Sequence, residues 1–227
     1  MSEKNHDYYT QSYYKLQRSG FVGWGNSIID RLVEKRASDK KKLDVIEIGG
    51  SSGEHLTFVN NFGEWNTYTI VDLIPGATNP KLYDTLKSKQ IKFIKADARE
   101  LPLQSSSFDL CILTCVLAHT AEPQAVVKEI KRVIKDGGKI VIGMPTDPGI
   151  VNRIIKKIIT FPKMRKQGIV SPQYCYALEH INPIHNLLAI LKEEFKNSNI
   201  KFSYFPFKIK SWNLNLVIVF ECIFTNK

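Results

Sequence analysis

Short runs that are apolar nearly throughout alternate along this chain with longer stretches in which apolar residues recur at helical spacing. Five of the runs have the composition of strands that are buried on both faces of a sheet. They cover residues 44–48, 67–71, 91–94, 108–114 and 139–144. Residues 122–138 show helical spacing and end in Gly137 and Gly138, which predicts a helix with a glycine C-cap. The alternation of strands and helices predicts a parallel sheet with helices on both faces.

The pattern changes after residue 200. Residues 201–207 and 213–225 are two further apolar runs with a short connection, which predicts a closing antiparallel pair. We therefore predict a single α/β domain of the doubly wound type, in which a mostly parallel seven-stranded sheet ends in a C-terminal antiparallel pair. A length of 227 residues suffices for one such domain with a substantial core.

Composition and charge bear on the location of the protein and on the class of its partner. The chain starts with a polar segment that lacks the apolar core of a secretory signal, so we expect a cytoplasmic protein whose four cysteines are reduced thiols. The net charge is +10, but 25 Lys stand against 7 Arg and much of the Lys is scattered. Nucleic-acid readers favour arginine forks and clustered basic stripes, so we do not expect nucleic acid as the partner.

The first predicted strand ends in "LDVIEIGGSSGEHL", residues 43–56, which places three glycines and two serines at its carboxyl end. Ligands of such sheets bind at this end, and glycines let the backbone turn sharply and approach a ligand closely. The dinucleotide pattern GxGxxG does not fit. From Gly49 it meets Ser51 and Glu54, and from Gly50 it meets Ser52 and His55.

Acidic residues follow the neighbouring strands. Glu47 stands two residues before Gly49, Asp72 ends the second strand, and Asp97 with Ala98 follows the third. A carboxylate like Asp72 can take both hydroxyls of a ribose, and Asp97 can accept from an exocyclic amine. Alternatively, Asp72 forms a turn and Asp97 caps a loop or helix. Together these positions indicate a nucleoside with a small charged tail and no pyrophosphate.

The chain resembles the class I S-adenosylmethionine-dependent methyltransferases over about residues 43–145. The likeness rests on "VIEIGGSSGEHL", "IVDL" and the block from "ADARELP" to "GGKIVI". The resemblance implies a Rossmann-like fold and S-adenosyl-L-methionine as cofactor. Ser51 stands where the family usually has glycine, and a serine is tolerable at this position if its φ stays negative. The stretches "GFVGWGN", "MPTDPG", "YALEHIN" and "SWNLNL" resemble a bacterial subgroup of small-molecule or glycan methyltransferases.

The resemblance implies a cofactor site made of Glu47, Gly49, Gly50, Ser51, Gly53, Asp72, Leu73, Asp97, Ala98 and Thr114. Its glycines shape the pocket for the amino-acid part of the cofactor, and Asp72 holds the ribose. Leu73 lies beside the adenine, whose edge Asp97 and Ala98 read. Thr114, at the end of the fourth strand, lies near the sulfonium. We assign no metal-ligating set.

Three residues are candidates for catalysis of proton removal from a methyl acceptor. His180 precedes the last helix beside Glu179, and a Glu–His pair can set the ring tautomer; the alternative is a helix-entry interaction. His119 follows the fourth strand, where a structural histidine that orients the loop is the favoured interpretation. Asp147 follows the fifth strand, in an Asp-Pro-Gly sequence that is also a common turn.

Two segments outside the core have open interpretations. Tyr8, Tyr9, Tyr13 and Tyr14 precede "SGFVGWGN", and a glycine-hinged lid over the cofactor is favoured slightly over an amphipathic helix. Residues 150–166 combine an apolar stripe with six basic residues. This segment suits an anionic substrate or a peripheral contact with an anionic membrane. We expect instead that its stripe packs on the sheet and its lysines are solvated.

We thus predict one methyltransferase domain over 1–227. It comprises an N-terminal lid or helices at 1–40, a cofactor-binding core at 43–145, a substrate-side insertion and helix at 146–199, and closing strands at 200–227. The predicted reaction is methyl transfer to oxygen or nitrogen of a small molecule or glycan precursor. The rivals are an RNA or protein methyltransferase, with a continuous basic surface at the pocket, and a non-catalytic protein that binds S-adenosylmethionine.

Overall fold

We analysed a computed structural model, which describes residues 20–37, 42–59, 64–89, 91–166 and 168–226 and, in the first helix, side chains from residue 27 onward. The predicted seven-stranded sheet is confirmed, with strand order β3-β2-β1-β4-β5-β7-β6. Its strands are β1 (Asp44–Ile48), β2 (Thr67–Asp72), β3 (Lys92–Lys95), β4 (Phe108–Thr114), β5 (Ile134–Pro145), β6 (Asn199–Phe205) and β7 (Val217–Ile223). The first five strands pair in parallel, and β7 runs antiparallel between β5 and β6.

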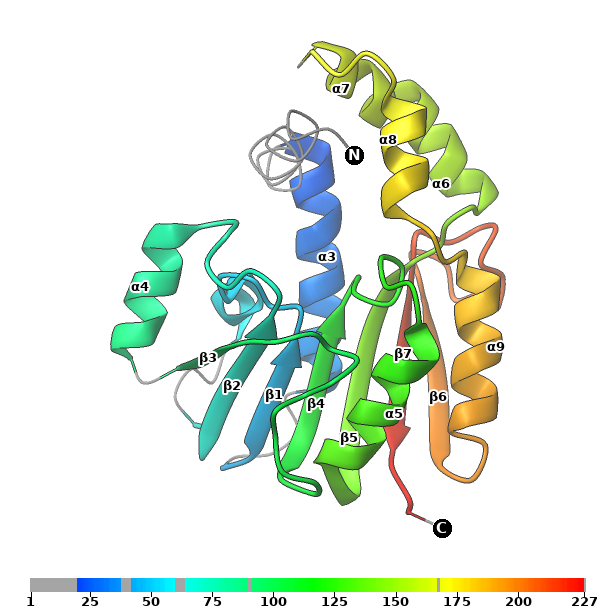
Figure 1. Cartoon of the computed structure of the whole chain (residues 1–227). Helices are drawn as coiled ribbons and strands as arrows, with labels where there is room; N and C mark the ends of the chain where they lie inside the picture. Colours follow the sequence, from blue (N-terminus) through cyan, green and yellow to red (C-terminus); the bar gives the residue numbers. More distant parts are fainter. Residues whose placement is uncertain (1–19, 38–41, 60–63, 90, 167, 227) are drawn as a thin grey trace.

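Helices cover both faces of the sheet, as doubly wound folds require (Figure 1). The helix α3 (Gly20–Ala37) lies on one face together with η2 (Glu54–Phe58) and α4 (Pro80–Ser88). The other face carries α5 (Pro123–Val133) and α9 (Ile184–Glu194). None of the helices in the described parts of the chain has the length and apolar content that a membrane span needs.

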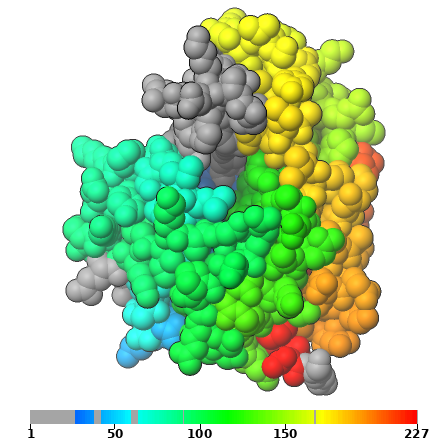
Figure 2. All heavy atoms as spheres, in the orientation of Figure 1, coloured from blue at the N-terminus to red at the C-terminus, as the bar shows by residue number. Residues whose placement is uncertain are grey.

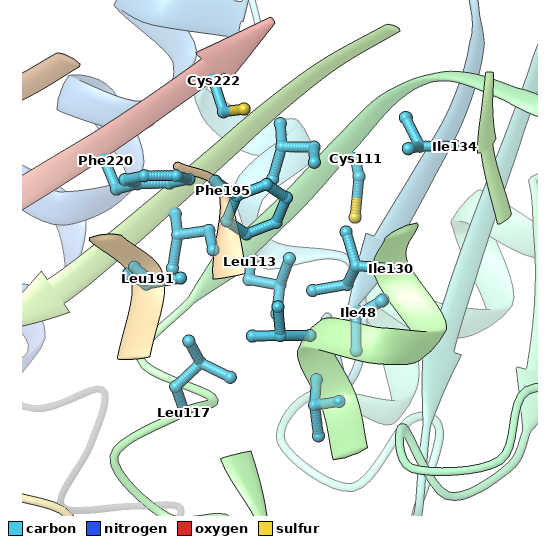
Figure 3. Packing of buried hydrophobic residues seen from close by; sticks show 14 of the residues in the cluster. Ile48, Cys111, Leu113, Leu117, Ile130, Ile134, Leu191, Phe195, Phe220 and Cys222 are labelled. Atoms are coloured by element: carbon cyan, nitrogen blue, oxygen red, sulfur yellow. The ribbon is translucent and has the colours of Figure 1, made fainter. Parts of the chain in front are cut away.

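The largest of the three buried clusters among the described residues lies between the sheet and the helices α5 and α9 (Figure 3). Phe195, just after α9, is 1% exposed and packs against Phe220 of β7 with ring centroids 5.4 Å apart. Ile130 of α5 is fully buried in the same cluster. Truncating such a side chain to Ala typically costs about 2–5 kcal/mol, so this cluster contributes strongly to the stability of the sheet domain.

The predicted glycine C-cap of the helix after β4 is wrong. Helix α5 ends at Val133, and Ile134 already pairs with Phe108 as the start of β5. The register then shifts, so that the next aligned pair joins Leu110 to Lys139. Gly137, with a φ of +74°, lies inside this irregularity. Burial of Ile134 in the sheet outweighs helix continuation, and the glycine serves a β-bulge.

The insertion between β5 and α9 forms a cap above the carboxyl ends of the parallel strands (Figure 1). We call residues 150–181 the cap. It contains α6 (Ile150–Ile155), the π-helical turn η3 (Lys156–Thr160), α7 (Phe161–Lys166) and α8 (Pro172–Glu179). In the space-filling view the cap forms the upper end of the molecule (Figure 2). It contacts the sheet domain through the side chains described below.

Candidate active site

The glycine turn after β1 needs residues without side chains. Gly49 and Gly53 have φ values of +74° and +83°. A Cβ on Gly50 would lie 2.7 Å from the Glu47 carboxyl group. Ser51 also has a positive φ, +44°, so the condition of a negative φ at this serine is not met. The backbone N–H of Ser51 donates to Asp72, and this bond holds the serine in the left-handed region.

The two serines connect this turn to the loop that precedes α4. The hydroxyls of Ser51 and Ser52 each lie 3.0 Å from the Thr78 hydroxyl. Thr78 also donates to the Glu54 carboxylate, which accepts the backbone N–H of Ser52 at 3.1 Å. The backbone N–H of Asn79 donates to the Ser52 hydroxyl at 2.7 Å. The serines therefore fix the turn in a polar network, a role that hydrogen bonds to backbone commonly give them.

Asp72 stands at the end of β2 and accepts two backbone N–H groups. One carboxylate oxygen accepts from Ser51 at 2.9 Å, and the other from Ile74 at 2.8 Å. These are the bonds of a turn-forming aspartate, yet each oxygen keeps acceptor capacity. Beside it, Leu73 is 60% exposed and Ile74 is 44% exposed. The carboxyl end of β2 therefore presents carboxylate oxygens next to an exposed apolar surface. This combination suits a nucleoside.

Asp97 lies in the loop after β3, and its carboxylate is bound by Arg99. The backbone N–H of Arg99 donates at 2.9 Å and its guanidinium at 2.7 Å. These hydrogen bonds lower the pKa of Asp97. Ala98 packs against the main core cluster. Both the adenine-reading role and the loop-forming role remain compatible with Asp97, because its side chain is still partly exposed.

A cavity of about 380 Å³ opens beside the glycine turn. It is lined by Ser27, Ile29, Asp30, Gly49, Ser51, Glu54, Thr57, Phe58, Thr78, Asn79, Leu82, Thr114 and Cys115. Thr114 and Cys115 come from the end of β4, and Cys115 has a φ of +63°. Backbone strain of this kind tends to occur at functional sites. Burial raises the pKa of the Cys115 thiol to about 12, so it stays a neutral wall of the cavity.

A buried charged cluster supports the turn from behind. Glu47, expected at the cofactor, is 2% exposed, does not line the cavity, and accepts from the Tyr68 hydroxyl at 2.8 Å. The His55 ring nitrogens lie 3.6 Å from an Asp30 oxygen and 3.3 Å from a Glu34 oxygen. These acids raise the pKa of His55 to about 10 against the opposing effect of burial, while burial raises that of Glu47 to about 7. The cluster attaches α3 to η2.

On the opposite side of the site, the cap meets the end of β5 at Asp147. This buried carboxylate contacts the ammonium of Lys156 and accepts a hydrogen bond from the Tyr176 hydroxyl. The Tyr176 oxygen lies 3.1 Å from Nδ1 of His180, and the two rings stack with centroids 3.9 Å apart. Since the Tyr176 proton goes to Asp147, Nδ1 of His180 must carry the proton that it donates to Tyr176. The lone pair of His180 is then on Nε2.

His119 extends this cluster from the loop after β4. Its Nδ1 lies 2.8 Å from the carbonyl oxygen of Glu179, and its ring meets that of His180 edge to face at 4.5 Å. The Glu179 carboxylate lies 3.8 Å from Nδ1 of His119. The predicted Glu179–His180 pair is therefore wrong, because Tyr176 and Asp147 hold His180. Burial lowers the pKa of His119 and, with His119 and Lys156 nearby, lowers that of His180 to about 2.

The three catalytic candidates, His119, Asp147 and His180, thus come together in one cluster, although they are far apart in sequence. Lys156 and Tyr176 were missed. Tyr176 stands four residues before His180 on one helix, a spacing that signals a shared face. The sequence did not indicate that Lys156 belongs to the site, because a lysine among other basic residues is expected to be exposed to solvent. The tyrosines at positions 8, 9, 13 and 14 lie outside the described residues.

The donor set fits the adenosine and amino-acid parts of S-adenosylmethionine. The glycine turn is close-packed on its inner side and forms one wall of the cavity on the other. Asp72 with exposed Leu73 follows at the end of β2 and Asp97 follows β3, both outside the lining of the cavity. Uncharged Thr114 and Cys115 close the cavity at β4. Direct contacts of the individual residues with a cofactor stay predictions.

Comparisons with known proteins agree with this geometry. Residues 46–142 match the model of a methyltransferase domain family. A ubiquinone/menaquinone biosynthesis C-methyltransferase of Shewanella woodyi is 22% identical over 156 residues, 66% of this chain and 62% of that protein. A demethylmenaquinone methyltransferase of Bacillus mycoides is 24% identical over 147 residues, 62% of each chain. The chain thus spans somewhat less than two thirds of these relatives.

The fold has solved counterparts. A crystal structure of a putative S-adenosyl-L-methionine-dependent methyltransferase from Methanococcus maripaludis superposes with a TM-score of 0.63 at 15% identity, over 96% of this chain and 93% of that one. S-adenosyl-L-methionine is the methyl donor that this family and fold imply. The matched domain, the relatives and the fold all agree with the resemblance to the class I S-adenosylmethionine-dependent methyltransferases.

Proposed function

We propose that this protein transfers a methyl group from S-adenosylmethionine to an oxygen or nitrogen atom of a small molecule or glycan precursor. The observation that supports this best is the cluster of Asp147, Tyr176, His180 and His119 between the cap and the ends of β4 and β5. Ionisable groups buried together at the ligand end of such a sheet are candidates for acid–base chemistry.

On the cofactor side, the chain binds and orients. S-adenosylmethionine supplies an activated methyl group on a positively charged sulfur. Gly49, Gly50, Ser51 and Gly53, supported from behind by Glu47, shape the pocket for its amino-acid part. The residues at the next strand ends hold its nucleoside: Asp72 the ribose, Leu73 one face of the adenine, and Asp97 and Ala98 the adenine edge. Thr114 lies nearest the acceptor side. Alignment of the two reactants provides much of the acceleration in such a displacement.

On the acceptor side, His180 takes part in proton removal. An oxygen or nitrogen acceptor must lose a proton, and Nε2 of His180 carries the available lone pair. The positive charge that develops on the ring is stabilised through Tyr176 by the carboxylate of Asp147, as in triads where a buried Asp supports a histidine. His119 positions the cluster by holding the backbone of Glu179 at the end of α8.

Lys156 makes this arrangement sensitive to pH. Burial lowers the pKa of Lys156 to about 7. The pKa of His180 is lowered mainly by burial, and His119 and the Lys156 ammonium add to this effect. When Lys156 loses its proton, the Asp147 charge becomes available to the His180 ring. We expect the methyl-transfer rate to rise as pH increases through about 7. Lys156→Arg keeps the cation and should abolish this rise, whereas Lys156→Met should leave the rate less dependent on pH.

Two experiments test the proposal in order. Calorimetry with S-adenosylmethionine and with its demethylated product tests cofactor binding, and mass spectrometry of candidate acceptors tests transfer. His180→Ala should then lower kcat by about 10²-fold or more, the usual contribution of a general base. His185→Ala, an exposed histidine outside the cluster, is the matched control and should keep wild-type kcat. No heat with either nucleoside would overturn the proposal.

A carbon acceptor is the second candidate, because two proteins similar to this chain are named as C-methyltransferases: the Shewanella woodyi relative and a sterol 4-C-methyltransferase of Caenorhabditis elegans. The same His180 lone pair could accept a proton from an acidic C–H group. Fragmentation of the methylated product separates the two candidates, since a methyl group on carbon resists the cleavage that releases one from oxygen or nitrogen.

A further inference from the structure

The first part of the cap, α6 with η3, exposes several isoleucines and buries a charged side chain. Ile154 is 51% exposed and Ile158 is 68% exposed, while Lys156 between them is 8% exposed. Ile150 and Ile159 are exposed as well, and α6 has no buried residue. The expectation that this stripe packs on the sheet is therefore wrong for these four isoleucines, whereas Val151 and Ile155 are half-buried. A surface helix normally does the opposite, with its apolar stripe turned toward the core.

Lys156 explains the orientation. Its ammonium reaches Asp147 and lies 3.7 Å from the centroid of the Tyr176 ring, so the start of η3 is held with this face inward. The chain here forms a π-helical turn, Lys156–Thr160, between two α-helical segments. Such turns change the helical register and occur frequently at functional sites. With Lys156 directed inward, the isoleucines two residues before and after it face away from the protein.

Positive charge surrounds the outward isoleucines. Arg153, Lys157, Arg165 and Lys166 are all exposed. Residues 150–178 contain no Asp or Glu, so no acidic side chain of this segment offsets that charge. Basic residues next to outward apolar side chains are the composition of helices that lie in the interface of an anionic membrane. A second copy of this surface would bring like charges together, which disfavours a symmetric protein dimer through it.

We propose that the cap docks on the surface of an anionic lipid bilayer, with Ile154 and Ile158 in the boundary between headgroups and acyl chains. Arg153, Lys157, Arg165 and Lys166 then lie at the level of the anionic headgroups, where each basic residue strengthens binding. The cap stands at the carboxyl ends of the parallel strands, the ligand end of the sheet (Figure 1). Docking there places the acceptor side of the site next to the bilayer. This proposal does not depend on the identity of the methyl acceptor.

Vesicle flotation with the full chain tests the docking. The probes are phosphatidylcholine vesicles with and without phosphatidylglycerol. We expect the wild type to float with the anionic vesicles alone and to be released by high salt. Ile154→Asp with Ile158→Asp, and separately Arg165→Glu with Lys166→Glu, should each weaken partitioning by roughly tenfold or more. Ile154→Leu with Ile158→Leu should retain it.

The matched charge control is Lys81→Glu with Lys92→Glu, two exposed lysines on α4 and β3 away from the cap. This pair should float as the wild type does, and thermal melts should show that every variant folds. Three outcomes would overturn the proposal. In the first, the wild type floats with neither kind of vesicle. In the second, the control pair reduces partitioning as strongly as the cap pairs do. In the third, sedimentation shows a dimer that dissociates in the isoleucine variants.

Discussion

Two basic side chains are buried among the described residues, and their surroundings shift their pKa values in opposite directions. His55, which lies behind the glycine turn, is 1% exposed. Lys156, on the inner face of the cap, is 8% exposed. Acidic neighbours raise the pKa of His55 to about 10 despite its burial, whereas burial lowers that of Lys156 to about 7. Burial alone therefore does not decide the charge of a basic group.

The difference lies in the number of carboxylates. His55 is surrounded by Asp30, Glu34 and Glu47, which together outweigh the loss of hydration. Lys156 faces the carboxylate of Asp147, which is shared with the Tyr176 hydroxyl. On the cofactor side, His55 is thus protonated at neutral pH and connects α3 to the turn through its carboxylate partners. The acceptor side carries a cation that can lose its charge near neutral pH.

Removal of the His55 ring should have the largest effect on stability. His55→Gln leaves three acidic side chains close together without their cation, and breaking a buried ion cluster in this way typically costs about 3–5 kcal/mol. Urea denaturation at pH 7 measures the loss in the free energy of unfolding. The loss should persist at pH 5 and shrink as pH rises toward 10, because the stabilisation that comes from the raised pKa of His55 is present at low pH. An unchanged midpoint at pH 7 would show that the cluster is not an ionic lock.

The pH dependence of stability should differ in sign between two variants. His55 has a raised pKa, so its stabilisation is present below pH 6.5 and is lost as pH rises through about 10. Lys156 has a lowered pKa, so its contribution is present above pH 10.5 and is lost as pH falls through about 7. Between pH 7 and 9 the two trends oppose each other in the wild type.

In that window Lys156→Met should become less stable as pH rises, because the His55 trend remains. His55→Gln should become more stable as pH rises, because the Lys156 trend remains. Each change should be about 2 kcal/mol over the two pH units. Denaturation curves at three pH values measure both slopes, and the double variant is the control, with neither trend. Slopes of the same sign would contradict the opposite pKa shifts.

Asp72→Ala should have a moderate effect. Two backbone N–H groups lose their acceptor, but the site is partly exposed and water replaces some of the bonding, so we expect a loss of about 1–2 kcal/mol. Affinity for S-adenosylmethionine should fall as well, by several kcal/mol at most, because a ribose hydroxyl pair loses its partner. Calorimetry separates the two effects. Unchanged affinity would contradict the placement of the ribose at Asp72.

Ile158→Asp should have the smallest effect, within about 0.5 kcal/mol of wild-type stability, because this side chain is directed away from the protein. The apolar residues of the sheet domain stabilise the fold, whereas those on the outer face of the cap contribute little. Thermal denaturation checks the difference. A loss above about 2 kcal/mol would show that the cap isoleucines pack against the protein in solution.

The strand pattern and the glycine turn were predictable from sequence, because both are local. A strand buried on both faces must be apolar throughout, and the sharp turn after Ile48 requires residues without side chains, so each leaves a contiguous signature. The glycines at 137 and 138 led to a wrong prediction of the helix end, because this pattern is also local. A glycine with positive φ serves a bulge as well as a cap, and only the pairing of Ile134 with Phe108 decides between them.

Tertiary structure alone decided the acceptor side and the orientation of the cap. Asp147, Lys156 and His180 meet through a chain reversal that no short-range pattern encodes, and Tyr176 completes the contact. The apolar stripe of residues 150–159 predicted packing on the sheet, since the periodicity shows that a helix has two faces but not which one turns inward. The inward face is set by the contact of Lys156 with Asp147, a long-range electrostatic interaction that depends on the folded sheet.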